Sequence, residues 1–74
     1  MKNFYDVQQF LKGYGLIIYM GKRLYDIELA QIELERLYDA GIMDRLDYIQ
    51  VQLILKKEHQ EELAYLEQKE KKEK

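Results

Sequence analysis

Apolar residues recur at every third or fourth position along most of the chain, and this spacing predicts amphipathic α-helices. Three segments show it: residues 3–14, residues 22–40 and a long segment from residue 45 onwards. The repeating apolar positions are Phe4, Val7, Leu11 and Tyr14, then Leu24, Ile27, Ala30, Leu34, Leu37 and Tyr38, then Tyr48, Val51 and Leu55. We therefore expect an all-α fold, a small three-helix bundle.

The expected helix ends are marked by a few polar residues and glycines. Asn3 is a favourable N-cap, and Asp6 stands three residues later in a position that resembles a capping box. Gly15 and Gly41 follow the first and second apolar repeats, where a left-handed glycine commonly ends a helix. Asp44 then begins the third helix.

An apolar segment, residues 16–20, lies between Gly15 and Gly21 and reads Leu-Ile-Ile-Tyr-Met. On its own it resembles a short strand, but the chain offers no second strand to pair with it. We expect a buried, extended connector between the first two helices, and we refer to residues 16–20 as the connector.

The last eight residues differ in composition from the rest of the chain. Residues 67–74 contain no apolar side chain, and Leu66 is the last one. Pairs of opposite charge four residues apart contribute only about 0.2–0.5 kcal/mol each to such a helix. We expect a three-helix domain over residues 1–66 and a charged, frayed or disordered tail over residues 67–74.

The second helix carries apolar residues on a second side, opposite its main face. This side consists of Tyr25, Leu29, Ile32 and Arg36, and it is a candidate interaction surface. Two interpretations are open. Either the connector folds over this side, or the side stays exposed and the protein associates with itself or with a partner helix.

The composition argues against catalysis and against a bound cofactor. The chain has no Cys, Ser or Thr, so the usual side-chain nucleophiles are missing, and its only histidine is His59. One histidine without cysteine does not make a closed zinc site, and we expect His59 to be a surface or partly packed residue. A domain of this size should also lack a typical small-molecule pocket of about 300 Å³ or more. We expect a non-enzymatic protein with no cofactor, no metal and no small-molecule substrate.

Charge is distributed unevenly although the net charge is only −2. Residues 1–25 carry four cations and one carboxylate, whereas residues 26–55 carry two arginines and seven carboxylates. The basic part is also aromatic, and its candidate nucleic-acid-binding residues are Lys12, Tyr14, Tyr19, Lys22, Arg23 and Tyr25. Cations suit phosphates and flat rings stack on bases. The alternative is that Tyr14 and Tyr19 belong to the core and the cations are merely solvated.

No membrane or export signal is expected in the sequence. The longest apolar run is the five-residue connector, far below the roughly 18 residues that span a bilayer. Asp6, Gln8 and Gln9 interrupt the region where a signal peptide would be apolar. We expect a soluble, cytoplasmic protein.

Several motifs carry a resemblance to a known family. They read NFYDVQQFLK at residues 3–12, IYMG at 18–21, LYDAGIMD at 37–44 followed by Asp47 and Tyr48, and LILKKE at 53–58. Together they resemble the YqgQ-like family of small uncharacterised proteins of Gram-positive bacteria. The resemblance implies a compact three-helix protein and a label of single-stranded nucleic-acid binding, without established catalytic residues. The leading hypothesis is therefore single-stranded nucleic-acid binding, and its rival is a protein–protein or self-association module that uses helix faces.

Overall fold

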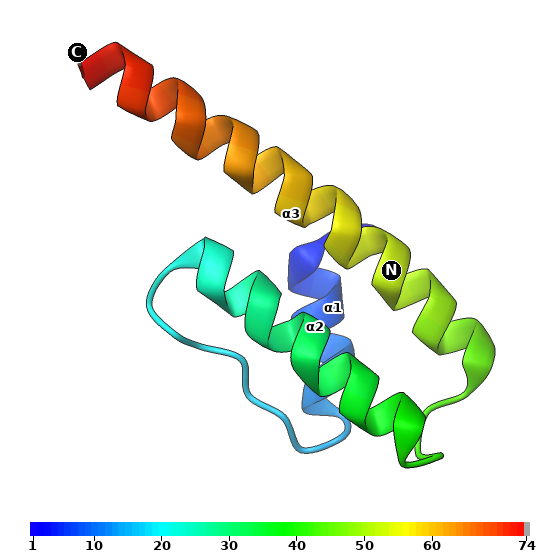
Figure 1. Cartoon of the computed structure of the whole chain (residues 1–74). Helices are drawn as coiled ribbons and strands as arrows, with labels where there is room; N and C mark the ends of the chain where they lie inside the picture. Colours follow the sequence, from blue (N-terminus) through cyan, green and yellow to red (C-terminus); the bar gives the residue numbers. More distant parts are fainter. Residues whose placement is uncertain (74) are drawn as a thin grey trace.

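The computed structural model describes the backbone of residues 1–73 and the side chains of residues 1–70. It contains three helices, α1 (Phe4–Lys12), α2 (Arg23–Asp39) and α3 (Arg45–Glu73), and no strand among the described residues. The helices α2 and α3 form an antiparallel hairpin, and α1 packs mainly against α3 (Figure 1). Because α3 continues well past the other two helices, the molecule is elongated, measuring 47 × 21 × 19 Å. The predicted all-α three-helix fold is confirmed.

The helix ends follow the capping residues predicted from the sequence. The Asn3 side chain accepts a hydrogen bond from the Asp6 amide at 3.0 Å, which satisfies a free donor of the first turn of α1. After α1 the chain turns at Gly15, where φ is 85°, and the Leu16 amide donates to the Leu11 carbonyl at 3.2 Å. Gly41 repeats this arrangement after α2 with φ of 74°. Positive φ values of this kind are accessible to glycine at little cost.

The hydrophobic core draws on all three helices, the connector and the loop before α3. Its buried residues are Phe4, Val7, Leu11, Ile18, Ile27, Ala30, Leu34, Met43, Val51 and Leu55. Most of them belong to the three apolar repeats of the sequence. The apolar spacing therefore predicts correctly which side of each helix faces inward.

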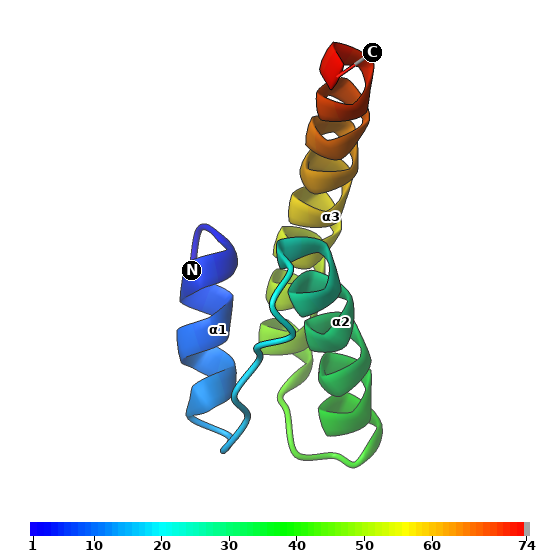
Figure 2. The ribbon, with the colours of Figure 1, turned by 90° about the vertical axis from the view of Figure 1, so that its left-hand side faces the viewer.

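The connector rises between α1 and α2, in the space between these two helices (Figure 2). Its backbone is extended, so successive side chains point to opposite sides. Ile18 is buried in the core, whereas Ile17 and Tyr19 are 81% and 78% exposed. The expectation of a buried connector is therefore wrong for Ile17, Tyr19 and Met20, which are exposed, and holds fully only for Ile18. An extended segment one strand wide buries only one side, and Met20 lies at its end.

Side chains from both flanking helices hold the connector in place. The Gln8 Nε2 atom of α1 donates to the Ile18 carbonyl at 3.4 Å, and the Met20 amide donates to the Asp26 carboxylate of α2. Among the side chains of residues 1–70, Asp26 is the one charged residue that is buried, and this main-chain contact gives its carboxylate a partner. The connector is thus a fixed part of the surface.

The C-terminal part of α3 extends away from the core. Leu55 is its last buried residue and Leu66 its last half-buried apolar one. The backbone is helical to Glu73, and residue 74 lies outside the described residues, so fraying of the tail over 67–74 stays a prediction. None of the described helices is both long enough and apolar enough to cross a bilayer.

Candidate nucleic-acid interface

Of the six candidate residues, two precede the connector, one lies on it and three follow it. Lys12 ends α1 at one end of the connector, whereas Lys22, Arg23 and Tyr25 lie at the start of α2 at its other end. Tyr19 lies on the connector itself, with its ring directed outward. The candidates therefore do not gather at one point, and Lys12 lines a different hollow from Lys22, Arg23 and Tyr25.

The two tyrosines that the sequence left open have different environments. Tyr14 is half-buried and packs edge-to-face on Phe10, with ring centroids 5.4 Å apart. Tyr19 is exposed and offers a free ring. Tyr14 is thus a packing residue, while Tyr19 can meet a base.

Arg23 contacts the two other helices. Its guanidinium lies 2.8 Å from the Glu58 carboxylate and 3.7 Å from that of Glu62, both on α3. It also lies 5.4 Å from the ring centroid of Phe4 on α1. Arg23 therefore links α2 to both neighbours, and two carboxylates balance its charge.

The lysines of this region differ from Arg23 in their lack of carboxylate partners. Within the described part of the chain, Lys12, Lys22 and Lys69 make no ion pair. The Lys22 ammonium lies 5.8 Å from the ring centroid of Tyr25, an exposed residue of the first turn of α2. These three lysines can meet an anion without first breaking a bond within the protein.

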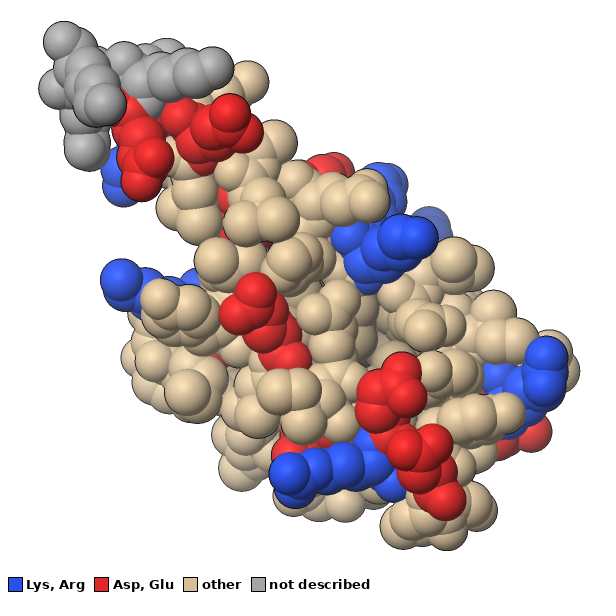
Figure 3. All heavy atoms as spheres, in the orientation of Figure 1, with Lys and Arg blue, Asp and Glu red and all other residues tan. Residues whose placement is uncertain are grey.

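A groove opens where α3 extends past the N-terminal end of α2. We call it the α2–α3 groove; its lining residues are Lys22, Arg23, Leu24, Tyr25, Glu62, Tyr65, Leu66 and Lys69. Its volume is about 420 Å³, and the space-filling view shows a notch between the projecting end of α3 and the start of α2 (Figure 3). The expectation that the domain lacks a hollow of 300 Å³ is therefore wrong, because it did not allow for the overhang of α3.

The first turn of α2 adds to the positive character of the groove. Lys22 occupies the N-cap position and makes no side-chain capping bond, and the first intrahelical bond is donated by the Asp26 amide. The main-chain N–H groups ahead of Asp26 are therefore not used by the helix, and such groups favour anions.

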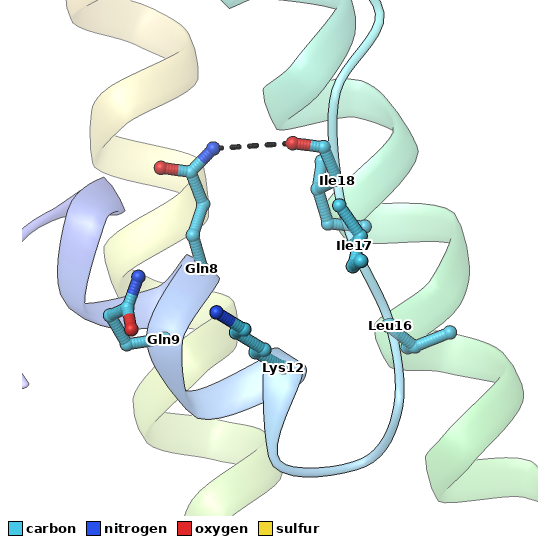
Figure 4. A pocket seen from close by; sticks show the side chains of 6 residues that line it. All are labelled: Gln8, Gln9, Lys12, Leu16, Ile17 and Ile18. Atoms are coloured by element: carbon cyan, nitrogen blue, oxygen red, sulfur yellow. Dashed lines mark hydrogen bonds between the residues drawn. The ribbon is translucent and has the colours of Figure 1, made fainter.

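A second, smaller hollow lies at the other end of the connector. We call it the glutamine pocket; its lining residues are Gln8, Gln9, Lys12, Leu16, Ile17 and Ile18. Its volume is about 220 Å³. The Lys12 side chain lies over the end of α1 with its ammonium turned away from the connector, and the Gln8 amide nitrogen points to the Ile18 carbonyl (Figure 4). The sequence did not single out Gln8 and Gln9 as site residues, because the bend after α1 that brings residue 17 back beside them is a tertiary feature.

The second side of α2 is only partly covered. Leu29 is half-buried and packs against the core, whereas Tyr25 and Ile32 remain exposed. Arg36 is exposed and lies 3.7 Å from the Glu33 carboxylate one turn earlier. Neither interpretation of this side holds for all of its residues, and Ile32 is its most exposed aliphatic member.

A more exposed apolar surface lies on the outer side of α3. Leu46 and Leu53 are 76% and 63% exposed, and Ile49 lies between them. We call these three residues the α3 stripe. Their spacing of three and four residues, out of phase with the buried Val51 and Leu55, predicts this second side of the helix from the sequence.

Two polar side-chain contacts join α2 to α3, and one of them involves His59. His59 Nε2 lies 2.9 Å from the Glu28 carboxylate, and the Tyr48 hydroxyl donates to Glu35 at 2.6 Å. The Glu35 hydrogen bond, followed by burial, raises the pKa of Tyr48 to about 12. No group of three potential metal ligands occurs among the described residues. His59 therefore serves as a bridge between two helices.

Comparison with known proteins gives a consistent result. The family model described as YqgQ-like matches residues 1–61. An uncharacterised protein of Bacillus subtilis (strain 168), YqgQ, is 40% identical over 58 residues, which cover 78% of this chain and 82% of that relative. The match spans α1, the connector, α2 and the packed part of α3. The chain therefore belongs to the YqgQ-like family.

Proposed function

We propose that this protein is a non-enzymatic binding protein that holds single-stranded nucleic acid along the connector. The strand follows the outward face of the connector, from the glutamine pocket past Tyr19 to the α2–α3 groove. One observation carries the proposal: the exposed ring of Tyr19 lies on an extended segment held against α1 and α2, between Lys12 and Lys22, which make no ion pair with any residue that the structure describes.

The chemistry of this line suits a single strand. Tyr19, Tyr25 and Tyr65 are exposed, and stacking of one base on an aromatic ring contributes about 1–3 kcal/mol. Lys12, Lys22 and Lys69 can contact phosphates, and the free N–H groups at the start of α2 add donors. Both kinds of contact are independent of sequence, as expected of a general single-strand binder.

The acidic residues of α2 do not oppose this arrangement, because most of them have partners. Asp26 accepts from the Met20 amide, and Glu33 pairs with Arg36. Glu28 and Glu35 contact His59 and Tyr48 on α3. Glu28 and Glu35 are thus directed at α3, and Arg36 offsets the charge of Glu33, whereas the Asp26 carboxylate lies against the connector itself.

Binding of a fluorescently labelled oligonucleotide, about 12 nucleotides long, tests the proposal by anisotropy. Affinity should fall as salt rises from about 50 to about 200 mM, because phosphate contacts release counterions. Tyr19→Ala should weaken binding by about tenfold. Lys22→Ala should weaken binding. It should also reduce the salt slope, which is the slope of log affinity against log salt concentration, by about 0.7. Lys57→Ala removes the same charge from the outer side of α3 and should leave binding unchanged.

Arg23 is unsuitable for this experiment because its loss would also disturb helix packing. Binding without salt dependence, or equal affinities for wild type, Tyr19→Ala and Lys22→Ala, would contradict the proposal. Thermal unfolding of each variant checks that a loss of oligonucleotide binding does not result from a loss of the folded structure.

The α3 stripe favours a second function, a protein–protein or self-association module. Leu46, Ile49 and Leu53 expose three aliphatic side chains on one face of a helix, which is the pattern of a docking surface. Sedimentation of wild type, Leu53→Glu and Ile32→Glu over a range of concentrations tests it. Self-association that is lost only in Leu53→Glu supports the stripe, and a monomer at all concentrations excludes self-association.

A further inference from the structure

We propose that the outer side of α3 is a docking surface for an acidic amphipathic helix of another protein. Such a helix carries an apolar stripe with carboxylates beside it. This inference rests on the second function given above for the α3 stripe and narrows the partner to one kind. It is independent of oligonucleotide binding along the connector.

The exposed side of α3 over residues 45–60 has an unusual set of side chains. No carboxylate is among them; they are the three aliphatic residues of the α3 stripe, three glutamines and the cations Arg45, Lys56 and Lys57. The two carboxylates of this range, Asp47 and Glu58, are half-buried, and exposed carboxylates occur again only beyond its ends, at Asp44 and Glu61. This surface therefore carries three positive charges, although the net charge of the protein is −2.

The cations and the aliphatic residues share one side of the helix. Lys56 and Lys57 follow Leu53 by three and four positions, and Arg45 precedes Ile49 by four, so each cation lies one turn from a member of the stripe. Figure 3 shows Lys and Arg atoms gathered over the middle of α3, at the edge away from α2. We call the α3 stripe together with these three cations the basic α3 face.

The spacing of the stripe indicates a helix as the occupant. Leu46, Ile49 and Leu53 lie three and four residues apart, which is the seam that packs against a partner helix in a coiled coil. A helix that lies in a membrane surface has a broader apolar face. Here glutamines and cations border a narrow seam. A partner helix with the same spacing can insert its own apolar side chains between these three.

The charge of the basic α3 face determines the sign of the partner. Arg45 lies at one end of the stripe and Lys56 and Lys57 at the other, so a second copy docked through the same face brings cations against cations in either direction. Like charges placed together disfavour such a complex, whereas carboxylates favour it. None of the three cations makes an ion pair within the part of the chain that the structure describes, so all are available.

Nucleic acid also brings negative charge, but it does not suit this face. Over residues 45–60 no aromatic ring is exposed, because Tyr48 is half-buried and bound to Glu35. Single strands depend on exposed rings for stacking of their bases, whereas an amphipathic helix uses aliphatic side chains. The basic α3 face therefore fits an acidic helix better than it fits a strand.

Two synthetic peptides test the inference. Each has about 21 residues in three heptads with leucine at the two core positions, and the positions beside the core carry glutamate in one peptide and lysine in the other. Binding of each labelled peptide to the full chain is measured by fluorescence anisotropy at neutral pH, where like charges disfavour pairing of a peptide with itself. We expect the acidic peptide to bind at least about tenfold more tightly than the basic one, with an affinity that falls as salt rises.

Variants of exposed residues assign the binding to the basic α3 face. Leu53→Gln should weaken the acidic peptide about tenfold, and Leu46→Gln provides a second variant of the stripe. Ile32→Gln, at an exposed aliphatic residue of α2, is the matched control and should bind like wild type. Lys57→Glu should weaken the acidic peptide about threefold to fivefold and strengthen the basic one. Lys2→Glu makes the same change of net charge and should affect neither peptide.

Several outcomes overturn the inference. It fails if neither peptide binds, if both bind equally, or if folded Leu53→Gln and Lys57→Glu proteins keep the wild-type affinities. Self-association of the protein alone that is lost in Leu53→Gln would make a second copy the occupant, which overturns the inference and leaves the docking function of the stripe standing. Pelleting with vesicles of anionic lipid that is lost in Leu53→Gln would make a membrane surface the occupant and overturns both. Displacement of the acidic peptide by the oligonucleotide would show one shared surface and also overturns the inference.

Discussion

Two adjacent cations at the start of α2 have different roles although the sequence presents them alike. Arg23 faces Glu58 and Glu62 on α3 and lies over the ring of Phe4 on α1. Lys22 lies over the neighbouring ring of Tyr25 and makes no ion pair among the described residues. Arginine suits the first environment because its planar guanidinium can bind carboxylates and stack on a ring at once. The sequence alone does not distinguish Arg23, which joins three helices, from Lys22, because the carboxylates that contact Arg23 lie on a distant part of the chain.

The hydrogen bond from Tyr48 to Glu35 predicts a specific dependence of stability on alkaline pH. The bond needs the protonated phenol, and it raises the pKa of Tyr48 from 10.0 to about 12. Because the folded pKa lies above the unfolded one, the stabilisation is complete below pH 10 and is lost as pH rises through 12. The free energies of unfolding of wild type and Tyr48→Phe, measured with urea, should differ most below pH 10 and converge towards pH 12.

Tyr5→Phe provides the control for this experiment, since Tyr5 is exposed and its hydroxyl makes no hydrogen bond in the described structure. It should follow the wild-type pH dependence. A difference in the free energy of unfolding between wild type and Tyr48→Phe that stays constant over the whole pH range would contradict the prediction. It would show that the Glu35 contact does not depend on the phenol proton.

At the scale of elements, the turn after α2 depends on one left-handed glycine. Gly41 has φ of 74°, and a Cβ added there would meet no atom within 4 Å. The cost of a side chain is therefore a backbone cost alone, about 1–2 kcal/mol for alanine. Urea unfolding should find Gly41→Ala destabilised by about this amount and Gly41→Asn by less, because asparagine tolerates this conformation better. Equal stability of all three proteins would contradict the role of the turn.

The sequence predicts these elements well because their signals are local. Asn3, Gly15 and Gly41 act on bonds within a few residues, and the inward face of each helix repeats every three or four positions. The connector shows where a local argument reaches its limit. Its apolar composition indicated burial, but which of Ile17, Ile18 and Tyr19 turns inward depends on how α1 and α2 flank it.

The candidate site was less predictable because it joins distant parts of the chain. Lys12, Tyr19 and Lys22 could be named from their composition alone. Tyr65 and Lys69 line the same groove as Lys22 but lie more than forty positions later. Their proximity follows from the antiparallel packing of α2 and α3 and from the length of α3. The glutamine pocket likewise exists only because the connector returns beside α1.

For the whole molecule, the packing indicates that the three-helix domain folds without the C-terminal tail, residues 67–74. The last buried side chain of α3 is Leu55, the last contacts to α2 include Glu62, and the match to the YqgQ-like family ends at residue 61. Deletion of residues 67–74 should therefore change the free energy of unfolding by no more than about 0.5 kcal/mol, the usual effect of a surface change. Deletion from residue 58 onwards removes both carboxylates that hold Arg23 and should lower the urea midpoint clearly.

The same two truncations separate the tail from the binding surface. The chain ending at residue 66 keeps Tyr65 but loses Lys69, together with three further lysines and three glutamates of the tail, so oligonucleotide affinity should fall modestly. Lys69→Ala in the full chain isolates the groove lysine and should lower the slope of log affinity against log salt by about 0.7. Circular dichroism adds a test of fraying: a tail that is mostly unfolded removes less helical signal than eight fully helical residues would. Marked destabilisation of the 1–66 chain would instead show that the projecting end of α3 belongs to the folded domain, because a solvated, separable tail contributes nothing to the core.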